Sequence, residues 1–181
     1  MTTTGSFARR SPASGDLGLL LLRIGVGAPL LHAGLRKVVD FSATASSFEQ
    51  SGWKAPELAT AMVSAAEVGG GALLLLGLLT PLAACAALGA MLCAWAVNVA
   101  AGPVWSDPFN FPFVLALGAA ALLVSGAGSI SLDGRVWGRP RWPASFAVAL
   151  LLTAVGVAVL TWVVLNGVNP IHLQAAQPTG R

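Results

Sequence analysis

The sequence predicts an all-α fold, a polytopic bundle of membrane-spanning helices, and three observations lead to it. Of the 181 residues, 56% are hydrophobic and only 9% are charged, whereas about a quarter of the residues in a soluble domain are charged. The mean hydropathy is +0.78. Long apolar stretches recur, and roughly 20 such residues cross the ~30 Å hydrocarbon core as a helix. They occupy residues 17–39, 59–79, 81–101, 109–124 and 144–165. The lipid bilayer is therefore the first expected partner.

The first span, residues 17–39, is expected to remain in the protein as a helix. It is longer than the apolar part of a secretory signal and contains Arg23, and it ends in Arg36 and Lys37 instead of a small-residue cleavage site. Residues 1–16, which are rich in Ser, Thr and Gly, are expected to form a disordered cytoplasmic tail.

The next spans are separated by turn signals. Thr80 followed by Pro81 is typical of a helix N-cap with a proline in the first turn. We therefore expect residues 59–79 and 81–101 to form a tight helical hairpin. The span at residues 109–124 is the shortest and begins among prolines.

The remaining residues are assigned by their position relative to these spans. Residues 17–135 hold the first four spans, which we expect to form a four-helix core. Residues 136–166 hold a loop and a fifth, C-terminal transmembrane helix, and residues 167–181 a short external tail. The sequence shows no internal repeat at a fixed period, and one domain is expected to account for the whole chain.

Basic residues are concentrated before the first span and before the fifth, and these residues are Arg9, Arg10, Arg135, Arg139 and Arg141. Short basic flanking segments stay on the cytoplasmic side of a membrane. We therefore expect the N-terminus to be cytoplasmic, with the loops at 40–57 and 102–108 on the outer side of the membrane. The net charge of +3 then comes from arginines at the inner face, and we expect no nucleic-acid partner.

Glu67 lies near the middle of the second span, where an ionisable group costs about 2.5–3.5 kcal/mol on insertion scales. Such a residue needs a reason and a partner. Gly70, Gly71 and Leu74 share its helical face, and small residues beside a polar one permit close helix packing. We expect this face to look into the bundle.

His32 is the expected partner of Glu67. At 1.5 Å of rise per residue, each lies roughly 10–12 Å from the outer end of its span, so we expect a hydrogen bond between them, directly or through one water. Four further residues lie near this depth or just above it and are expected to bind a ligand, namely Arg36, Lys37, Trp95 and Asn98.

Three interpretations of the Glu67–His32 pair stay open. The pair is a structural lock on helix register, or a ligand or proton-handling site in which both residues are catalytic, or a chance placement. A metal site that adds His172 lacks any ligand-spacing signature, so no metal is expected.

Cys85 and Cys93 lie eight residues apart on one predicted helix, about 12 Å along its axis. A disulfide needs Cα atoms within about 7 Å. The two cysteines are therefore expected to be packing residues and not a redox pair.

The polar and glycine residues of the first span fall into two stripes. One holds Arg23, Gly27, Gly34 and Lys37, and the other holds Gly25, His32 and Arg36. Arg23 lies near the inner end, where its side chain can reach the interface.

Three segments, LLRIGVGAPLLHAGLRKV, AAEVGGGALLLLGLLTPLAA and GAGSISLDG, resemble in order and spacing the DoxX family of small bacterial membrane proteins. The positions that match the family pattern are Arg23, His32, Gly34, Lys37, Glu67, Gly69, Gly70, Gly77, Thr80, Ser131, Leu132 and Asp133. The resemblance covers residues 17–135 and leaves the fifth span outside the usual four-helix core. Structural roles are expected for Arg23, Gly34, Gly70, Gly71, Gly77 and Asp133.

The resemblance implies membrane redox chemistry. Members of the family are associated with a thiosulfate:quinone oxidoreductase, with an oxidative-stress complex, and with the maturation of a periplasmic amine dehydrogenase. Two function classes follow. The chain is a redox-linked subunit that acts with a quinone and a redox-protein partner, or it is a non-catalytic membrane anchor or assembly factor. The sequence leaves open whether the chain is itself an enzyme.

Overall fold

The computed structural model describes residues 14–101, 107–138 and 141–166, and the regular secondary structure of these residues is helical with no strand. The helices are α1 (Ser14–Val39), α2 (Phe41–Gln50), α3 (Pro56–Leu76), α4 (Thr80–Ala101), α5 (Phe111–Ser125), α6 (Leu132–Val136) and α7 (Ala144–Thr161), followed by a π-helical turn at Trp162–Asn166. The predicted all-α fold is confirmed.

Within the described residues, four helices are long and apolar enough to cross a membrane. They are α1, α3, α4 and the continuous segment Ala144–Asn166, whereas α5 is shorter, with 15 residues. The outward sides of these helices are apolar, since Leu21, Leu117 and Leu152 are 62%, 63% and 66% exposed. Large apolar side chains exposed on such helices imply that the bundle contacts the lipid bilayer.

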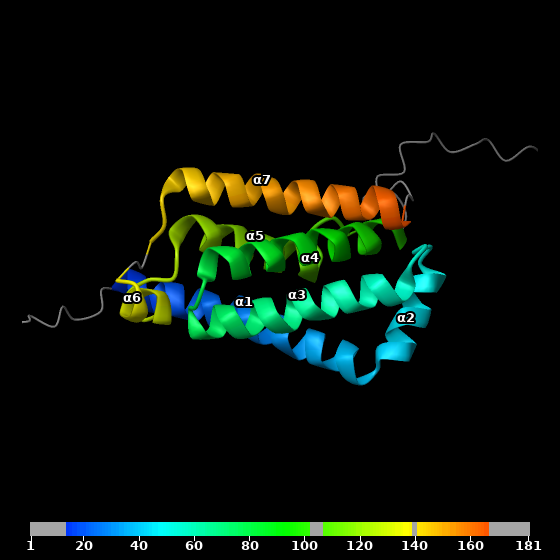
Figure 1. Ribbon diagram of the computed structural model, residues 1–181, viewed down its shortest axis with the longest axis horizontal. Helices are drawn as coiled ribbons and strands as arrows, with labels where there is room; N and C mark the ends of the chain where they lie inside the picture. The colour runs from blue at the N-terminus through cyan, green and yellow to red at the C-terminus, as the bar shows by residue number, and fades with distance from the viewer. Residues whose placement is uncertain (1–13, 102–106, 139–140, 167–181) are drawn as a thin grey trace, which may run out of the picture.

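The long helices lie side by side along one axis, with α4 and α5 between α7 on one side and α1 and α3 on the other (Figure 1). The short helix α2 lies at one end of the bundle and α6 at the opposite end. We call these the α2 end and the α6 end. The start of α1 lies at the α6 end, where Ser129 N and Oγ donate to the carboxylate of Asp16 at 2.8 and 2.6 Å.

Glycines allow α1 and α3 to pack closely. A Cβ on Gly27 would lie 2.9 Å from the backbone oxygen of Gly71, and a Cβ on Gly71 would lie 2.6 Å from the backbone nitrogen of Leu31. On α3, Gly70 faces α4 instead, where a Cβ would lie 3.3 Å from the backbone oxygen of Ala83. Close backbone approach of this kind is the usual basis of helix association in lipid.

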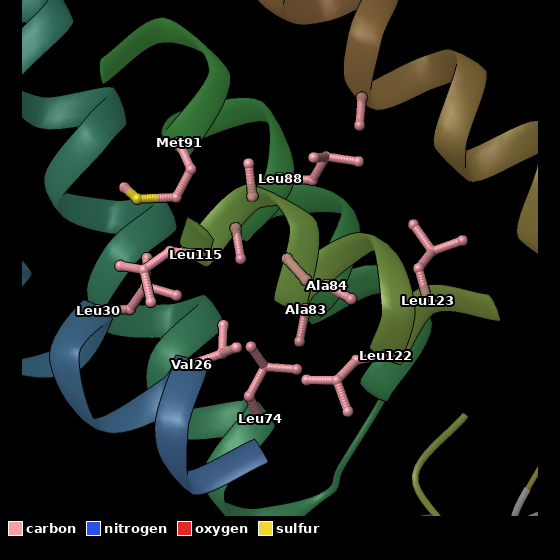
Figure 2. Packing of buried hydrophobic residues seen from close by; sticks show 14 of the residues in the cluster. Val26, Leu30, Leu74, Ala83, Ala84, Leu88, Met91, Leu115, Leu122 and Leu123 are labelled. Carbon is pink, nitrogen blue, oxygen red and sulfur yellow. The ribbon is translucent and has the colours of Figure 1, made fainter. Parts of the chain in front are cut away.

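The centre of the bundle toward the α6 end is an apolar core. Figure 2 shows Val26 and Leu30 of α1 grouped with Leu74 of α3, Leu122 of α5 and Met91 of α4. Leu30, Leu74 and Leu122 are each 0% exposed. Side chains from α1, α3, α4 and α5 therefore fill this part of the bundle.

Two expected boundaries differ from the structure. Residues 40–57, expected to be a loop, contain α2, because Phe41, Ala45 and Phe48 recur at helical spacing and Ala45 is buried. The helix α1 begins at Ser14, inside the expected tail of residues 1–16. The rest of that tail and the expected external tail at 167–181 lie outside the described residues.

Candidate functional site

An ion pair lies between the first two long helices. Lys37 Nζ of α1 donates to Glu67 Oε2 of α3 at 2.6 Å. The Glu67 side chain is 2% exposed and that of Lys37 26% exposed. A carboxylate that is buried in this way is stable only with a close partner, and Lys37 supplies the opposite charge and a hydrogen bond together.

The local sequence explains why the pair forms. Glu67, Gly70, Gly71 and Leu74 are all buried, as expected for the inward face of α3. A Cβ on Gly34 would lie 2.8 Å from Glu67 Cβ, so only glycine lets α1 approach the carboxylate this closely. Lys37 follows Gly34 by three residues on the same face of the helix.

The pair lies on the wall of a cavity of about 430 Å³. Helices α3 and α7 both pack on α4, and the cavity runs between α3 and α7 with α4 as its floor. Most of its lining is small and apolar, and the floor residues are Cys85, Ala86, Gly89, Ala90, Cys93, Ala94, Val97 and Asn98. The site therefore combines a mostly apolar cavity with one charged pair.

The helix α7 forms the far wall of the cavity through Thr153, Ala154, Val157, Ala158 and Thr161. Helices α4 and α7 meet along a seam of small residues. Cys85 Sγ contacts Leu150 O at 3.3 Å and Cys93 Sγ contacts Ala158 O at 3.7 Å, with Gly89 between them. This geometry makes each cysteine a packing residue against α7, and both are free thiols.

The helix α2 forms a hydroxyl-bearing edge of the same cavity. Thr44, Ser47 and Ser51 all line it, together with Phe48 and Trp53. Trp53 is held by edge-on ring contacts with Phe48, at 5.2 Å between centroids, and with Trp162 after α7, at 5.8 Å. Phe48 and Trp53 thus bound the cavity at the α2 end, and Trp162, which follows α7, supports Trp53.

A second polar cluster joins the α3–α4 turn to α6. Asp133 Oδ1 accepts from Leu79 N at 2.7 Å and Oδ2 accepts from Thr80 N at 2.9 Å. Asp133 N in turn donates to Gly77 O at 2.8 Å. The side chain of Arg23 donates to Ile130 O. This cluster fixes the α6 end of the bundle.

The cluster corrects one expectation. Thr80 was expected to cap the helix that follows it, but its hydroxyl has no hydrogen-bond partner among the described residues. Asp133 accepts instead from the N–H of Thr80, the first residue of α4, and from that of Leu79 just before it. A carboxylate at a helix N-terminus also interacts favourably with the helix dipole, so the distant residue is the better cap.

The chain was compared with models of known protein families. Residues 18–100 match the model of the DoxX family. This part of the chain is a DoxX domain. The match covers α1 to α4, which include Lys37 and Glu67. No curated protein and no solved structure matched the chain.

The DoxX match ends at residue 100 and therefore includes only part of the second polar cluster. Ser131, Leu132 and Asp133, which resemble the family pattern, lie beyond residue 100. Within the matched residues, Arg23 and Gly77 come together at the α6 end, where a Cβ on Gly77 would overlap the Arg23 guanidinium. Gly77 also has φ +63, a conformation that favours glycine.

The predicted hydrogen bond between Glu67 and His32 is wrong. Glu67 accepts from Lys37, whereas His32 is exposed on α1. His32 is two residues from both Leu30 and Gly34, which face the bundle, and two residues rotate a helix by about 200°. The imidazole therefore lies on the opposite side of α1 from Glu67, although the two residues are at similar depth.

Of the other four residues expected to bind a ligand, two lie at the cavity and two do not. Lys37 and Asn98 line the cavity, whereas Arg36 and Trp95 do not. Arg36 is exposed, and Trp95 Nε1 donates to Pro108 O at 2.8 Å. Trp95 thus joins α4 to the segment before α5.

Sequence reasoning missed the α2 edge and the α7 wall. The spacing of Thr44, Ser47 and Ser51, three and then four residues apart, was the available signal of a single polar helical face. In the part of the chain that the structure describes, no three His, Cys, Asp or Glu residues come close enough to hold a metal ion. His172 lies outside that part.

Proposed function

We propose that this chain is a redox-linked membrane subunit that binds a quinone-class carrier in the cavity beside Lys37 and Glu67. The observation that carries the proposal is that a buried ion pair lies on the wall of a cavity of about 430 Å³ whose other walls are mostly apolar. Ligand sites commonly combine apolar walls with a few placed polar groups. A carrier with a polar ring and a hydrocarbon tail suits both parts of this cavity.

The polar groups suit the proposed chemistry. A quinone supplies a two-electron, two-proton couple when it is bound. The Lys37 ammonium has three N–H donors, of which one is used by Glu67, so it can also donate to a carbonyl oxygen. The Glu67 carboxylate can accept a proton and return it. The electrons come from a redox-protein partner in this proposal.

The proposed location is the cytoplasmic membrane of a bacterium, with the N-terminus in the cytoplasm. The start of α1 and the segment around α6 lie at the same end of the bundle, as the distribution of arginines requires. The α2 end, and with it the hydroxyl edge of the cavity, then faces outward.

The test is to purify the protein in mild detergent, extract the bound lipids and measure quinone per protein. Val157 lies at the cavity rim on α7 and is 50% exposed, so Val157→Trp should fill the cavity without disturbing the core. Val159, 58% exposed on the same helix, does not line the cavity, and Val159→Trp is the matched control. We expect quinone in the wild type and the control, and its loss in Val157→Trp. Equal quinone in all three proteins would show carry-over from the membrane and overturn the proposal.

A non-catalytic anchor or assembly factor is the second candidate. The observation that favours it is that Glu67 is already paired with Lys37. Holding α1 against α3 would then be a sufficient role for this pair. Glu67→Gln separates the two candidates, since glutamine keeps the shape and still accepts a hydrogen bond but cannot carry a proton. If the chain is an anchor, the Glu67→Gln variant should fold and complement a deletion strain normally. If the chain is a redox subunit, the same variant should fold normally and fail to complement.

A further inference from the structure

Three hydroxyl side chains line the cavity from α2 and its C-cap residue, beside the aromatic ring of Phe48. Thr44, Ser47 and Ser51 line the same cavity as Lys37 and Glu67. Thr44 Oγ1 donates to Asp40 O at 2.9 Å and Ser51 Oγ donates to Ser47 O at 2.8 Å. Each of these hydroxyls keeps its lone pairs free to accept from water. Ser47 and Ser51 are exposed and Thr44 is half-buried, so the row of hydroxyls leads from the surface inward.

The opposite direction is closed. From Glu67 toward the α6 end, the next residues on the same face of α3 are Gly70, Gly71 and Leu74, all buried. They pack against the apolar core of Figure 2, in which Leu30 and Leu74 are 0% exposed. None of these three buried residues of α3 carries a side-chain hydrogen-bond donor or acceptor. Water has no hydrogen-bonding group to follow in that direction.

We infer that the Thr44–Ser47–Ser51 face of α2 is the route by which water reaches the Lys37–Glu67 pair, so that the pair exchanges protons with the α2 end of the bundle only. The use of those protons rests on the proposed redox function, whereas the route itself does not. The asymmetry gives a direction to the chemistry: a proton taken up or released at Glu67 comes from or goes to the side of the membrane on which α2 lies.

The route can be tested by thiol accessibility in a variant that lacks both native cysteines. Ala66 lines the cavity beside Glu67, so Ala66→Cys places a thiol at the inner end of the route. Ser64→Cys is the matched control, since Ser64 is buried on the same helix and does not line the cavity. Ser51→Cys marks the α2 end. A charged, membrane-impermeant methanethiosulfonate reagent is added to right-side-out and inverted vesicles.

We expect Ala66→Cys to react from the side on which Ser51→Cys reacts and not from the other side, while Ser64→Cys reacts from neither. Ser47→Leu should then slow the reaction of Ala66→Cys roughly tenfold, because it replaces a hydroxyl of the route with an apolar side chain. Ser46→Leu, at the adjacent exposed position that does not line the cavity, should leave the rate unchanged.

Reaction of Ala66→Cys from the α6 side, no reaction from either side, or equal slowing by Ser46→Leu and Ser47→Leu would each overturn the inference. Measurement of co-purified quinone tests the proposed function, whereas thiol labelling tests the water route. Labelling as expected with no co-purified quinone would leave the route standing and remove the quinone. Co-purified quinone without labelling from the α2 side would do the reverse.

Discussion

Gly34 of α1 lies directly against Glu67 of α3, so closely that a Cβ on Gly34 would be 2.8 Å from Glu67 Cβ and 2.8 Å from the backbone nitrogen of Val68. This contact sets the distance between the two helices at the level of the buried carboxylate. It also places Lys37, one turn further along α1, within 2.6 Å of Glu67 Oε2. The ion pair therefore depends on the absence of a side chain at Gly34 as much as on the two charges.

Gly34→Ala should separate α1 from α3. We expect it to lower the free energy of unfolding by about 1–3 kcal/mol, the usual cost of overpacking, because the backbone of α3 cannot move aside as a flexible side chain could. Thermal unfolding in detergent measures the change. Gly25→Ala is the control on the same helix, since a Cβ there meets nothing within 4 Å. It should be neutral or stabilise by up to about 1 kcal/mol through helix propensity. Equal effects of the two substitutions would contradict the proposed contact.

Lys37 and Glu67 should be strongly coupled in a double-mutant cycle. Lys37→Met leaves the carboxylate buried without a partner, and we expect a loss of about 2–3 kcal/mol, below the ~3–5 kcal/mol for a fully buried pair because Lys37 is 26% exposed. Lys37→Met combined with Glu67→Met should recover most of this loss, since both charges are then removed.

The control for this cycle is Arg36→Met, which removes the neighbouring exposed cation of α1. We expect a change within about 0.5 kcal/mol. If the double variant is as unstable as the sum of its two single variants, Lys37 and Glu67 do not stabilise one another, and their proximity is incidental.

The sequence was sufficient to predict the long helices and the inward face of α3, but not the short helix α2. Long apolar stretches determine the spans by length alone, and glycines beside Glu67 identify the face that packs. The partner of Glu67 could not be predicted in the same way. His32 and Lys37 lie at almost equally suitable depths in the membrane to reach Glu67. Which of them faces Glu67 is decided by the rotation of α1 about its axis. That rotation is set by Gly27 and Gly34 against α3, a contact that exists only once the two helices have met.

The cavity was also beyond sequence reasoning, because it is formed by helices that are distant in the chain. Its α7 wall depends on the seam in which Cys85 and Cys93 contact the backbone of α7. Small residues at every fourth position are common in membrane helices, so the sequence alone does not say which helix covers them. Likewise, nothing near Thr80 indicates that Asp133 caps α4.

Asp133 should stabilise the α6 end through its two hydrogen bonds to Leu79 N and Thr80 N. Asp133→Asn retains one acceptor and loses the charge, and we expect a loss of about 1–3 kcal/mol, as for hydrogen bonds to a charged group. Leu79 has φ 48, which costs a residue with a side chain on the order of 1–2 kcal/mol, so the turn should loosen when its acceptor is weakened. Asp40→Asn is the control, because Asp40 precedes α2 without a side-chain capping bond. Thermal unfolding of both variants measures the difference, and equal stability would remove the capping role.

The orientation of the bundle is the prediction on which the direction of proton exchange depends. Single cysteines at Ser51, at the α2 end, and at Ser11, before α1, are introduced into a variant without native cysteines. In intact cells we expect a membrane-impermeant thiol reagent to modify Ser51→Cys and to leave Ser11→Cys unmodified until the cells are opened. The reason is the arginines that precede α1 and α7, because short basic flanking segments favour the cytoplasmic side of a membrane. The reverse pattern would turn the hydroxyl edge of the cavity toward the cytoplasm, and the Lys37–Glu67 pair would then exchange its protons on that side.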